Sequence, residues 1–297
     1  MTTRLTQIPP GPAEKYDRSQ NLLSWMMCNF KEFGDIYRAS IYGSDVYVVS
    51  GPQYADYILR ENWQNYKKGQ AIKRIGLLLG NGLMVSEGKF WKKQRRMIQP
   101  AFHQEAIVAL TNVITEANAA LIEKWERAAL ENVSVNITLD ISQMVLEVVL
   151  ISLFGDDYTK VAPHFRILSS ESTRDLQFAQ SFRPLGNLVA QVVANRRREN
   201  RVSTDILGVL MKARDRESGQ GMPERQLVSE IMTLIVAGHE TTANTLDWIW
   251  YLLSQNAEAE EKLSAEISML RESGFGLGDL PKFRELYTLL PELTYLE

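Results

Sequence analysis

The segment between residues 223 and 255 constrains the fold of this chain most strongly. It contains no internal proline, and Gly238 is its one poor helix former. As a single helix it would be roughly 50 Å long at 1.5 Å per residue. Its flanks, 227–238 and 248–253, are apolar on nearly all sides. We therefore expect this helix to run through the centre of the molecule.

Helical spacing of apolar residues predominates in the rest of the chain. It predicts helices at 16–33, 52–60, 89–99, 104–129, 137–153, 164–172, 184–200, 204–216 and 257–272. Only 36–41 and 46–50 alternate as strands do, with a hairpin turn expected at 43–45. The glycine-rich stretch 274–278 predicts a loop. These patterns predict a mainly α-helical fold with a small N-terminal β-sheet, in a single domain over 1–297 that opens with a proline-rich lead at 1–12.

The composition excludes several functional classes. The 297 residues carry a net charge of −3, so the whole molecule has no bulk attraction to nucleic acid or anionic membranes. Cys28 is the single cysteine, which excludes an internal disulfide and fits a reducing compartment. Residues 1–8 are polar, and the charge-free apolar stretch at 231–238 is far shorter than the ~20 residues of a membrane span. We expect a soluble, cytoplasmic protein without a membrane anchor.

An unusual group of side chains interrupts the apolar central helix at Ala237-Gly238-His239-Glu240-Thr241-Thr242. Glycine alone costs about 1 kcal/mol relative to alanine in a helix, and local widening of a helix at such a position is often functional. The alternative is a packing notch for a neighbouring helix, with Glu240 reaching solvent. His-Glu also begins a zinc-protease pattern, but Ala243 occupies the place of the second histidine, so we predict no metal site built from these side chains.

The basic segment that precedes Pro100 carries a second pattern. Trp91 and Arg95 are four residues apart and share one helix face, which we expect to point inward. An inward arginine needs an anionic partner, because a buried unpaired charge is very unfavourable. The simple alternative is a solvated basic face. A nucleic-acid patch is disfavoured, since no broad basic field surrounds these residues.

Together these segments resemble a cytochrome P450. The stretch 82–96 resembles the C helix of that family with its Trp-x-x-x-Arg motif, at Trp91 and Arg95. Residues 237–242 match the Ala/Gly-Gly-x-Asp/Glu-Thr-Thr/Ser motif of its central I helix. The motifs occur in the family's order, and the resemblance covers essentially the whole chain. It implies the cytochrome P450 fold and a haem b cofactor.

The resemblance also implies a role for each matching residue around the haem. Arg95, helped by Trp91, would bind a haem propionate. Ala237 and Gly238 would let the central helix widen over the iron. Thr241 would hydrogen-bond the oxygen ligand, and Glu240 would help to relay protons to it.

Further implied roles concern the substrate and the electron donor. Met84, Val85 and Leu234 would face a small apolar substrate. The cations expected to point outward would face an acidic ferredoxin- or flavodoxin-type donor, as in soluble bacterial members; they are Lys92, Lys93 and Arg96. The activity implied is a haem-dependent monooxygenase reaction.

The same resemblance predicts what the given chain lacks. In the family, a Glu-x-x-Arg motif and then the cysteine that ligates iron follow the region that resembles 293–297. Neither motif is present here, so we expect that thiolate ligation is not possible in the chain as given. The alternative function is therefore a truncated, catalytically inactive cytochrome P450 fragment that acts at most as an interaction protein.

Overall fold

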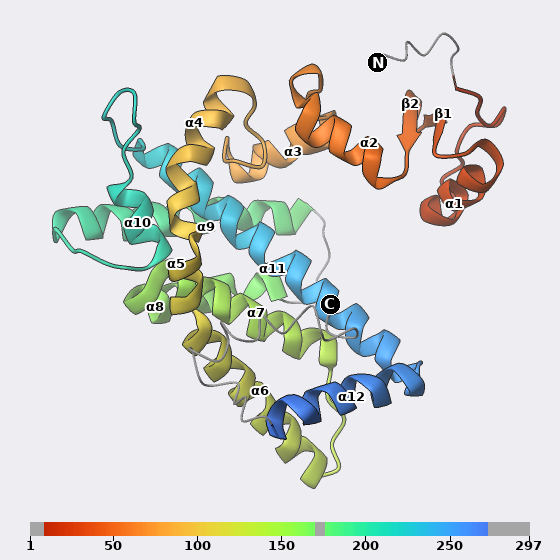
Figure 1. Cartoon of the computed structure of the whole chain (residues 1–297). Coiled ribbons are helices and arrows are strands. Elements are labelled where there is room, and N and C mark those ends of the chain that lie inside the picture. The colour runs from red at the N-terminus through yellow and green to blue at the C-terminus, as the bar shows by residue number, and fades with distance from the viewer. Residues whose placement is uncertain (1–8, 170–175, 273–297) are drawn as a thin grey trace. The chain divides into compact units, whose positions relative to one another are not determined.

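The structure is a computed structural model that describes residues 9–169 and 176–272. The chain divides into two compact units, Met1–Lys67 and Lys68–Glu297. Helices dominate, and the described strands form one two-stranded sheet, so the predicted fold class is confirmed (Figure 1). The loop expected at 274–278 and the end of the helix expected at 164–172 lie outside the described residues.

Helix α1 (Leu22–Phe33) opens the regular structure of the N-terminal unit. It begins at Asn21, whose side chain accepts the amide of Ser24 at 2.9 Å, as a helix cap does. The predicted start at residue 16 was wrong, because the Tyr16 amide donates to the carbonyl of Ser40 in the first strand instead. The helix ends at Gly34, which adopts a φ of 84°.

Strands β1 (Ile36–Ile41) and β2 (Ser44–Val49) form an antiparallel hairpin. Ile41 pairs with Ser44, so the turn is Tyr42-Gly43 rather than the predicted 43–45. Both turn residues have positive φ, as a two-residue hairpin turn requires. Helix α2 (Pro52–Asp56) follows and continues as a π-helix (Tyr57–Glu61) and a 3-10 helix (Trp63–Asn65).

The second unit is built from helices. They are α3 (Gln70–Leu79), α4 (Gly88–Ile98), α5 (Gln104–Ala109), α6 (Thr111–Leu130), α7 (Ile137–Phe154), α8 (Tyr158–Phe165), α9 (Leu176–Arg198), α10 (Ile206–Lys212), α11 (Glu224–Ser254) and α12 (Ala257–Glu272). The helix predicted at 104–129 is two helices that meet at Leu110. Helix α9 begins before the predicted start and keeps Pro184 inside it.

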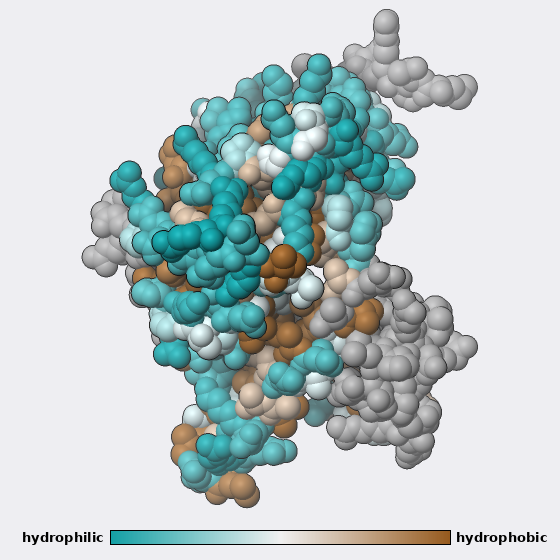
Figure 2. Space-filling model, turned by 90° about the vertical axis from the view of Figure 1, so that its left-hand side faces the viewer, coloured by the Kyte–Doolittle hydropathy of each residue, from teal (hydrophilic) through white to brown (hydrophobic). Residues whose placement is uncertain are grey.

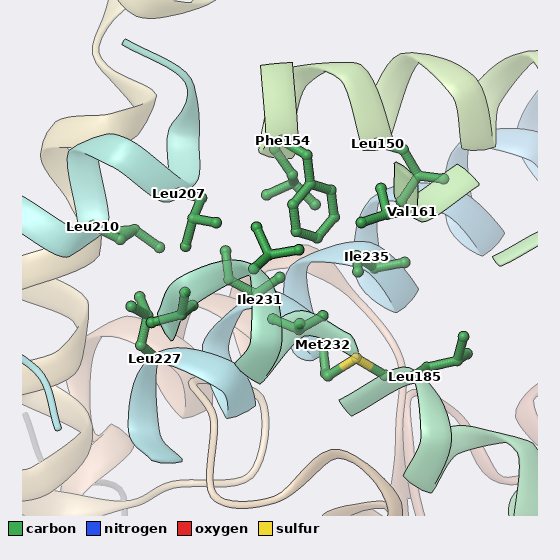
Figure 3. Packing of buried hydrophobic residues seen from close by; sticks show 14 of the residues in the cluster. Leu150, Phe154, Val161, Leu185, Leu207, Leu210, Leu227, Ile231, Met232 and Ile235 are labelled. Atoms are coloured by element: carbon green, nitrogen blue, oxygen red, sulfur yellow. The ribbon is translucent and has the colours of Figure 1, made fainter. Parts of the chain in front are cut away.

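The core of this unit surrounds the N-terminal half of α11 (Figure 3). Leu227, Ile231 and Ile235 of α11 are fully buried. They meet apolar side chains of the neighbouring helices, which include Leu150 and Phe154 of α7, Val161 of α8, Leu185 of α9, and Leu207 and Leu210 of α10. The expected central position of this half is confirmed.

The C-terminal half of α11 differs from the prediction. The side chain of Trp248 is 62% exposed, and Trp250 and Leu252 are about half exposed. Trp250 stacks edge-on against Trp125 of α6 at 5.7 Å between ring centroids, but the described helices leave most of this face uncovered. Apolar composition alone therefore placed this segment too deep in the molecule.

A buried arginine joins the end of α9 to α7 and α10. Arg196 is 1% exposed, and its guanidinium donates to Asp157 at 2.8 Å, to Asp205 at 2.7 Å and to the carbonyl of Phe154 at 2.6 Å. Its neighbours Arg197 and Arg198 remain at the surface. The three consecutive arginines therefore differ in environment, and only Arg196 crosslinks three elements.

Two described segments, Ala106–Leu130 and Ile137–Ser169, are long and apolar enough to cross a membrane by length and composition. The second contains α7, where Ile141 and Leu150 are 1% exposed because they face other helices of the unit. A core helix passes the same test, so this finding is weak evidence of a span.

Candidate functional site

One face of α11 is attached to α7 at the unusual hexapeptide. A Cβ placed on Gly238 would lie 3.3 Å from Val149 of α7, so the glycine permits close packing. The next residue, His239, is 5% exposed, and its Nε2 lies 3.0 Å from the Ser142 hydroxyl and 3.1 Å from the Ser142 carbonyl. Gly238 and His239 therefore serve packing against a neighbouring helix, which was the alternative interpretation of this segment.

A second face of α11 carries the other residues of the motif. Leu234 and Ala237 are half-buried, while Glu240 and Thr241 are exposed. The Thr241 hydroxyl donates to the carbonyl of Ala237 at 2.6 Å. Because 234, 237 and 241 follow helical spacing, they form one stripe. The expected widening is not present: α11 is described as a continuous α-helix from Glu224 to Ser254.

Helix α4 presents a cation on an aromatic ring. Its buried face is Gln94, Met97 and Ile98 rather than the predicted pair. The structure does bring that pair together, since the guanidinium of Arg95 lies over the ring of Trp91 at 5.3 Å. Arg95 is exposed, and among the described residues it forms no ion pair. Arg95 lies on α4, whereas Glu240 and Thr241 lie on α11.

The outward cations of α4 are only partly available. Lys92 is exposed, whereas Lys93 pairs with Asp215 at 3.3 Å and Arg96 pairs with Glu217 at 2.9 Å. Hydrogen bonds from Ser218, followed by the nearby Lys93, hold the pKa of Asp215 below its usual range despite an opposing effect of burial. The acidic residues of the α10–α11 connection therefore neutralise two of the three predicted donor-facing cations.

Sequence reasoning missed a group of basic residues that lies between α4 and α10. A cavity of about 220 Å³ lies between α4 and α10, and Arg96, Lys212, Arg214 and Arg216 are among its lining residues. The three basic residues within 212–216 were the available signal. Figure 2, viewed from the left of Figure 1, shows a mostly hydrophilic surface with scattered apolar patches.

The loop 82–87 carries the predicted substrate residues Met84 and Val85, both half-buried. Its attachment to α11 was also missed: the amide of Leu83 donates to the carboxylate of Glu230 at 2.7 Å, one turn before Leu234. The signal was an acid within the apolar flank of the central helix. The loop and the Leu234 turn of α11 are therefore brought together.

His239 gives the α7–α11 contact a defined pH dependence. Burial lowers its pKa below 6.5, outweighing the opposing effects of its bond to Ser142 and of the nearby Glu240 charge. The unfolded chain therefore binds a proton more readily than the folded protein, so stability is lost as pH falls below about 6.5. We expect His239→Gln to reduce this acid destabilisation, measured by urea unfolding at about pH 7.5 and pH 5.

His164, which is exposed, provides the matched control. His164→Gln should leave the pH dependence of unfolding as it is in the wild type. Equal pH dependence in His239→Gln and the wild type would contradict the assigned role of His239.

The described residues hold no group of three or more histidine, cysteine, aspartate and glutamate side chains that could bind a metal ion. Cys28 is exposed in α1 of the N-terminal unit. The motif residues of the second unit place a guanidinium on α4 and a carboxylate and a hydroxyl on α11.

Comparison with known families shows to which family these two helices belong. The cytochrome P450 family model matches residues 10–166 and 160–282, which is most of the chain. The chain belongs to the cytochrome P450 family. This cytochrome P450 carries the half-exposed stripe of α11 and the Trp91–Arg95 pair on the segments where the sequence motifs predicted the family's site.

Curated relatives give the same assignment. The chain is 30% identical over 286 residues to cyclooctat-9-en-7-ol 5-monooxygenase of Streptomyces melanosporofaciens, covering 86% of this chain and 58% of the relative. It is 26% identical to the chloroplastic carotene epsilon-monooxygenase of Arabidopsis thaliana, and the match covers 90% of this chain and 54% of the relative. The chain thus spans about half the length of the curated relatives it matches.

Solved structures confirm the fold. The haem domain of cytochrome P450DA matches with a TM-score of 0.72 at 22% identity, covering 90% of this chain and 64% of that one. Retinoic acid-bound cyanobacterial CYP120A1 matches with a TM-score of 0.68 at 20% identity, covering 89% and 64%.

Membership of this family implies haem as the cofactor, and the residues present fit that group in two respects. Arg95 offers an exposed guanidinium, held over Trp91, for a carboxylate. On α11, Ala237 places only a methyl group between Leu234 and Thr241. The guanidinium and this small side chain suit a cofactor with acidic side groups.

Proposed function

We propose that this cytochrome P450 is a haem-dependent monooxygenase that inserts one atom of O₂ into an apolar organic substrate. The observation that supports this most is the stripe of α11, where an acid and a hydroxyl, Glu240 and Thr241, are exposed beside the small residue Ala237. An acid and a hydroxyl beside a small residue supply the groups that positioned proton transfer needs. The second oxygen atom leaves as water, which requires two electrons and two protons.

Each residue of the site has a task in this reaction. Haem, when bound, supplies the iron chemistry that activates oxygen. Arg95 and Trp91 hold a propionate. Thr241 turns its hydroxyl from the Ala237 carbonyl toward the open face and holds a proton there. Glu240, being exposed, takes protons from water and passes them to that hydroxyl.

An apolar isoprenoid is the proposed substrate class. Two relatives are named for oxygenation of cyclooctat-9-en-7-ol and of carotene. In this chain Met84, Val85 and Leu234 are half-buried apolar side chains on the loop 82–87 and on α11. These side chains offer apolar contact to such a substrate and no charge.

A ferredoxin- or flavodoxin-type protein is the proposed electron donor. Of the three cations predicted to face the donor, Lys92 is the one that remains exposed without a described ion pair, and it would meet an acidic donor first. Lys93 and Arg96 would join it as donor carboxylates compete with Asp215 and Glu217. The cytoplasmic location without a membrane anchor stays a prediction. The single-domain organisation also stays a prediction.

Labelled oxygen tests this function. Haem-loaded protein, supplied with reduced ferredoxin and carotenes or cyclic diterpene alcohols under ¹⁸O₂, should give a product with one ¹⁸O atom. Thr241→Ala should lower product formation about 100-fold, since positioned proton transfer contributes on that order. Thr242→Ala, on the adjacent exposed position, should stay near wild type. Product without label, or equal rates in both variants, would sink the proposal.

A further inference from the structure

The side chain of Lys68, just before α3, binds three backbone carbonyls of one loop. Its Nζ donates to the carbonyls of Leu83 at 3.0 Å, Met84 at 2.7 Å and Ser86 at 2.9 Å. An ammonium group has three donors, and all three are used here. The backbone amide of Lys68 also donates to the carboxylate of Glu87 at 2.5 Å. One residue therefore satisfies four acceptors within 83–87.

A buried acid holds the same loop from the side of α11. Glu230 is 0% exposed, and its carboxylate accepts the amide of Leu83 at 2.7 Å and the side chain of Gln226 at 2.6 Å. Gln226 in turn donates to the carbonyl of Asn81 at 2.9 Å. The two polar groups of the Leu83 backbone are thus bound by side chains of opposite charge, Lys68 on the carbonyl and Glu230 on the amide.

The chain before the loop lies directly on α11. A Cβ on Gly82 would be 2.2 Å from the hydroxyl of Thr233 and 2.7 Å from the carbonyl of Ser229. A Cβ on Gly80 would be 2.3 Å from the Ser229 hydroxyl. Side chains at these two positions would push the loop away, so the glycines permit the approach that brings Leu83 to Glu230.

The bonds from Lys68 and Glu230 also hold the backbone of Met84 and Val85, the two residues that follow Leu83. The carbonyl of Met84 is held by Lys68, and Val85 lies between that carbonyl and the bound carbonyl of Ser86. Val85 packs against Gly76 of α3, where a Cβ would be 2.8 Å from its Cγ1. Both side chains therefore take their positions from backbone atoms that Lys68 binds.

We propose that Lys68, together with Glu230, holds the 82–87 loop in one shape against α11 and is thereby a specificity-determining positioning residue. The proposal rests on the proposed function for one point, the substrate-facing role of Met84 and Val85. The loop shape can be tested without haem or substrate. Lys68 acts through the backbone of the loop, where its Nζ binds three carbonyls.

Hydrogen exchange of the purified protein tests the structural part. Lys68→Met keeps the length and apolar stem of the side chain and removes the three donors. Amides in 83–87 should exchange about 10- to 100-fold faster, because bonds to a charged group are lost and Glu230 loses its counter-charge. Peptides of α7 should be unchanged. Lys67→Met, at the exposed neighbouring position, is the matched control and should match the wild type.

A second variant covers the case in which Lys68→Met does not fold. Glu230→Gln keeps an acceptor for the Leu83 amide, removes the charge and replaces the oxygen that accepts from Gln226 with a donor, so exchange within 83–87 should rise several-fold. Unchanged exchange in 83–87 in either folded variant, or equal loosening in Lys67→Met, overturns the proposal.

Ligand selectivity tests whether Lys68 determines specificity. The same experiment separately tests the proposed monooxygenase function. Haem-loaded wild type should bind a bulky and a small isoprenoid with different dissociation constants, and Lys68→Met should change their ratio about 10-fold. Failure of the wild type to bind any apolar ligand counts against the proposed function. Binding by the wild type with an unchanged ratio in Lys68→Met counts against the role of Lys68 alone.

Discussion

Replacing Arg196 with methionine is expected to lower the free energy of unfolding by about 3–5 kcal/mol. The variant keeps most of the apolar stem but leaves Asp157 and Asp205 buried without the guanidinium that binds both. Each carboxylate retains other partners, Arg201 and Lys160 at Asp157 and Ser203 at Asp205, but none of these partners binds both acids as the guanidinium does. Urea unfolding of the purified protein measures the loss.

Arg198→Met provides the control at the same helix end. Arg198 is exposed, and within the described part of the chain it bonds locally, to Asn195, so its replacement should change stability by less than about 0.5 kcal/mol. Arg196→Lys should fall between the two, because a single ammonium cannot reproduce the forked bonds. A loss below about 1 kcal/mol in Arg196→Met would show that the network contributes little.

Replacing Arg95 with alanine is expected to weaken haem binding about 10- to 100-fold. A bond from a guanidinium to a carboxylate contributes roughly 1.5–3 kcal/mol, and each 1.4 kcal/mol corresponds to about tenfold in affinity. The geometry behind this expectation is the exposed guanidinium over Trp91, which the described residues leave without an ion pair. Absorbance titration of the protein with haem measures the change.

The adjacent Arg96 is the matched control, since it pairs with Glu217 at the surface instead. Arg96→Ala should change haem affinity less than about threefold, because exposed ion pairs contribute little. Equal weakening by both substitutions would assign the effect to general positive charge on α4, and no weakening by Arg95→Ala would remove Arg95 from the haem site.

Local pattern was enough to predict much of the fold. Helices α4, α7, α11 and α12 begin and end within one residue of their predicted limits, because helix start and stop signals act locally. Helix α3 was not predicted, and α8 ends at Phe165, near the start of the helix predicted at 164–172. The hairpin was predicted too, but its turn was misplaced by one residue. Tyr42 carries positive φ despite its bulky side chain, and only the strand register shows that it belongs to the turn.

Long-range contacts could not be read from the sequence. Arg196 and its two exposed neighbours look alike in sequence, and only the approach of α7 and α10 makes one of them a buried crosslink. Lys68 and Glu230 lie far apart in the chain, and both look like ordinary charged residues until the 82–87 loop lies between them. Of the site, residue types and spacing predicted the two helices that carry it; the exposure of the α11 stripe and the partners of each charge required the structure.

Haem titration of the wild-type protein tests the central claim most directly, because every proposed role on α4 and α11 depends on that cofactor. The account predicts saturable binding at one haem per chain, with a defined Soret band that depends on Arg95. Haem uptake that never saturates, or that is the same in Arg95→Ala as in the wild type, would contradict the proposed site and the function built on it.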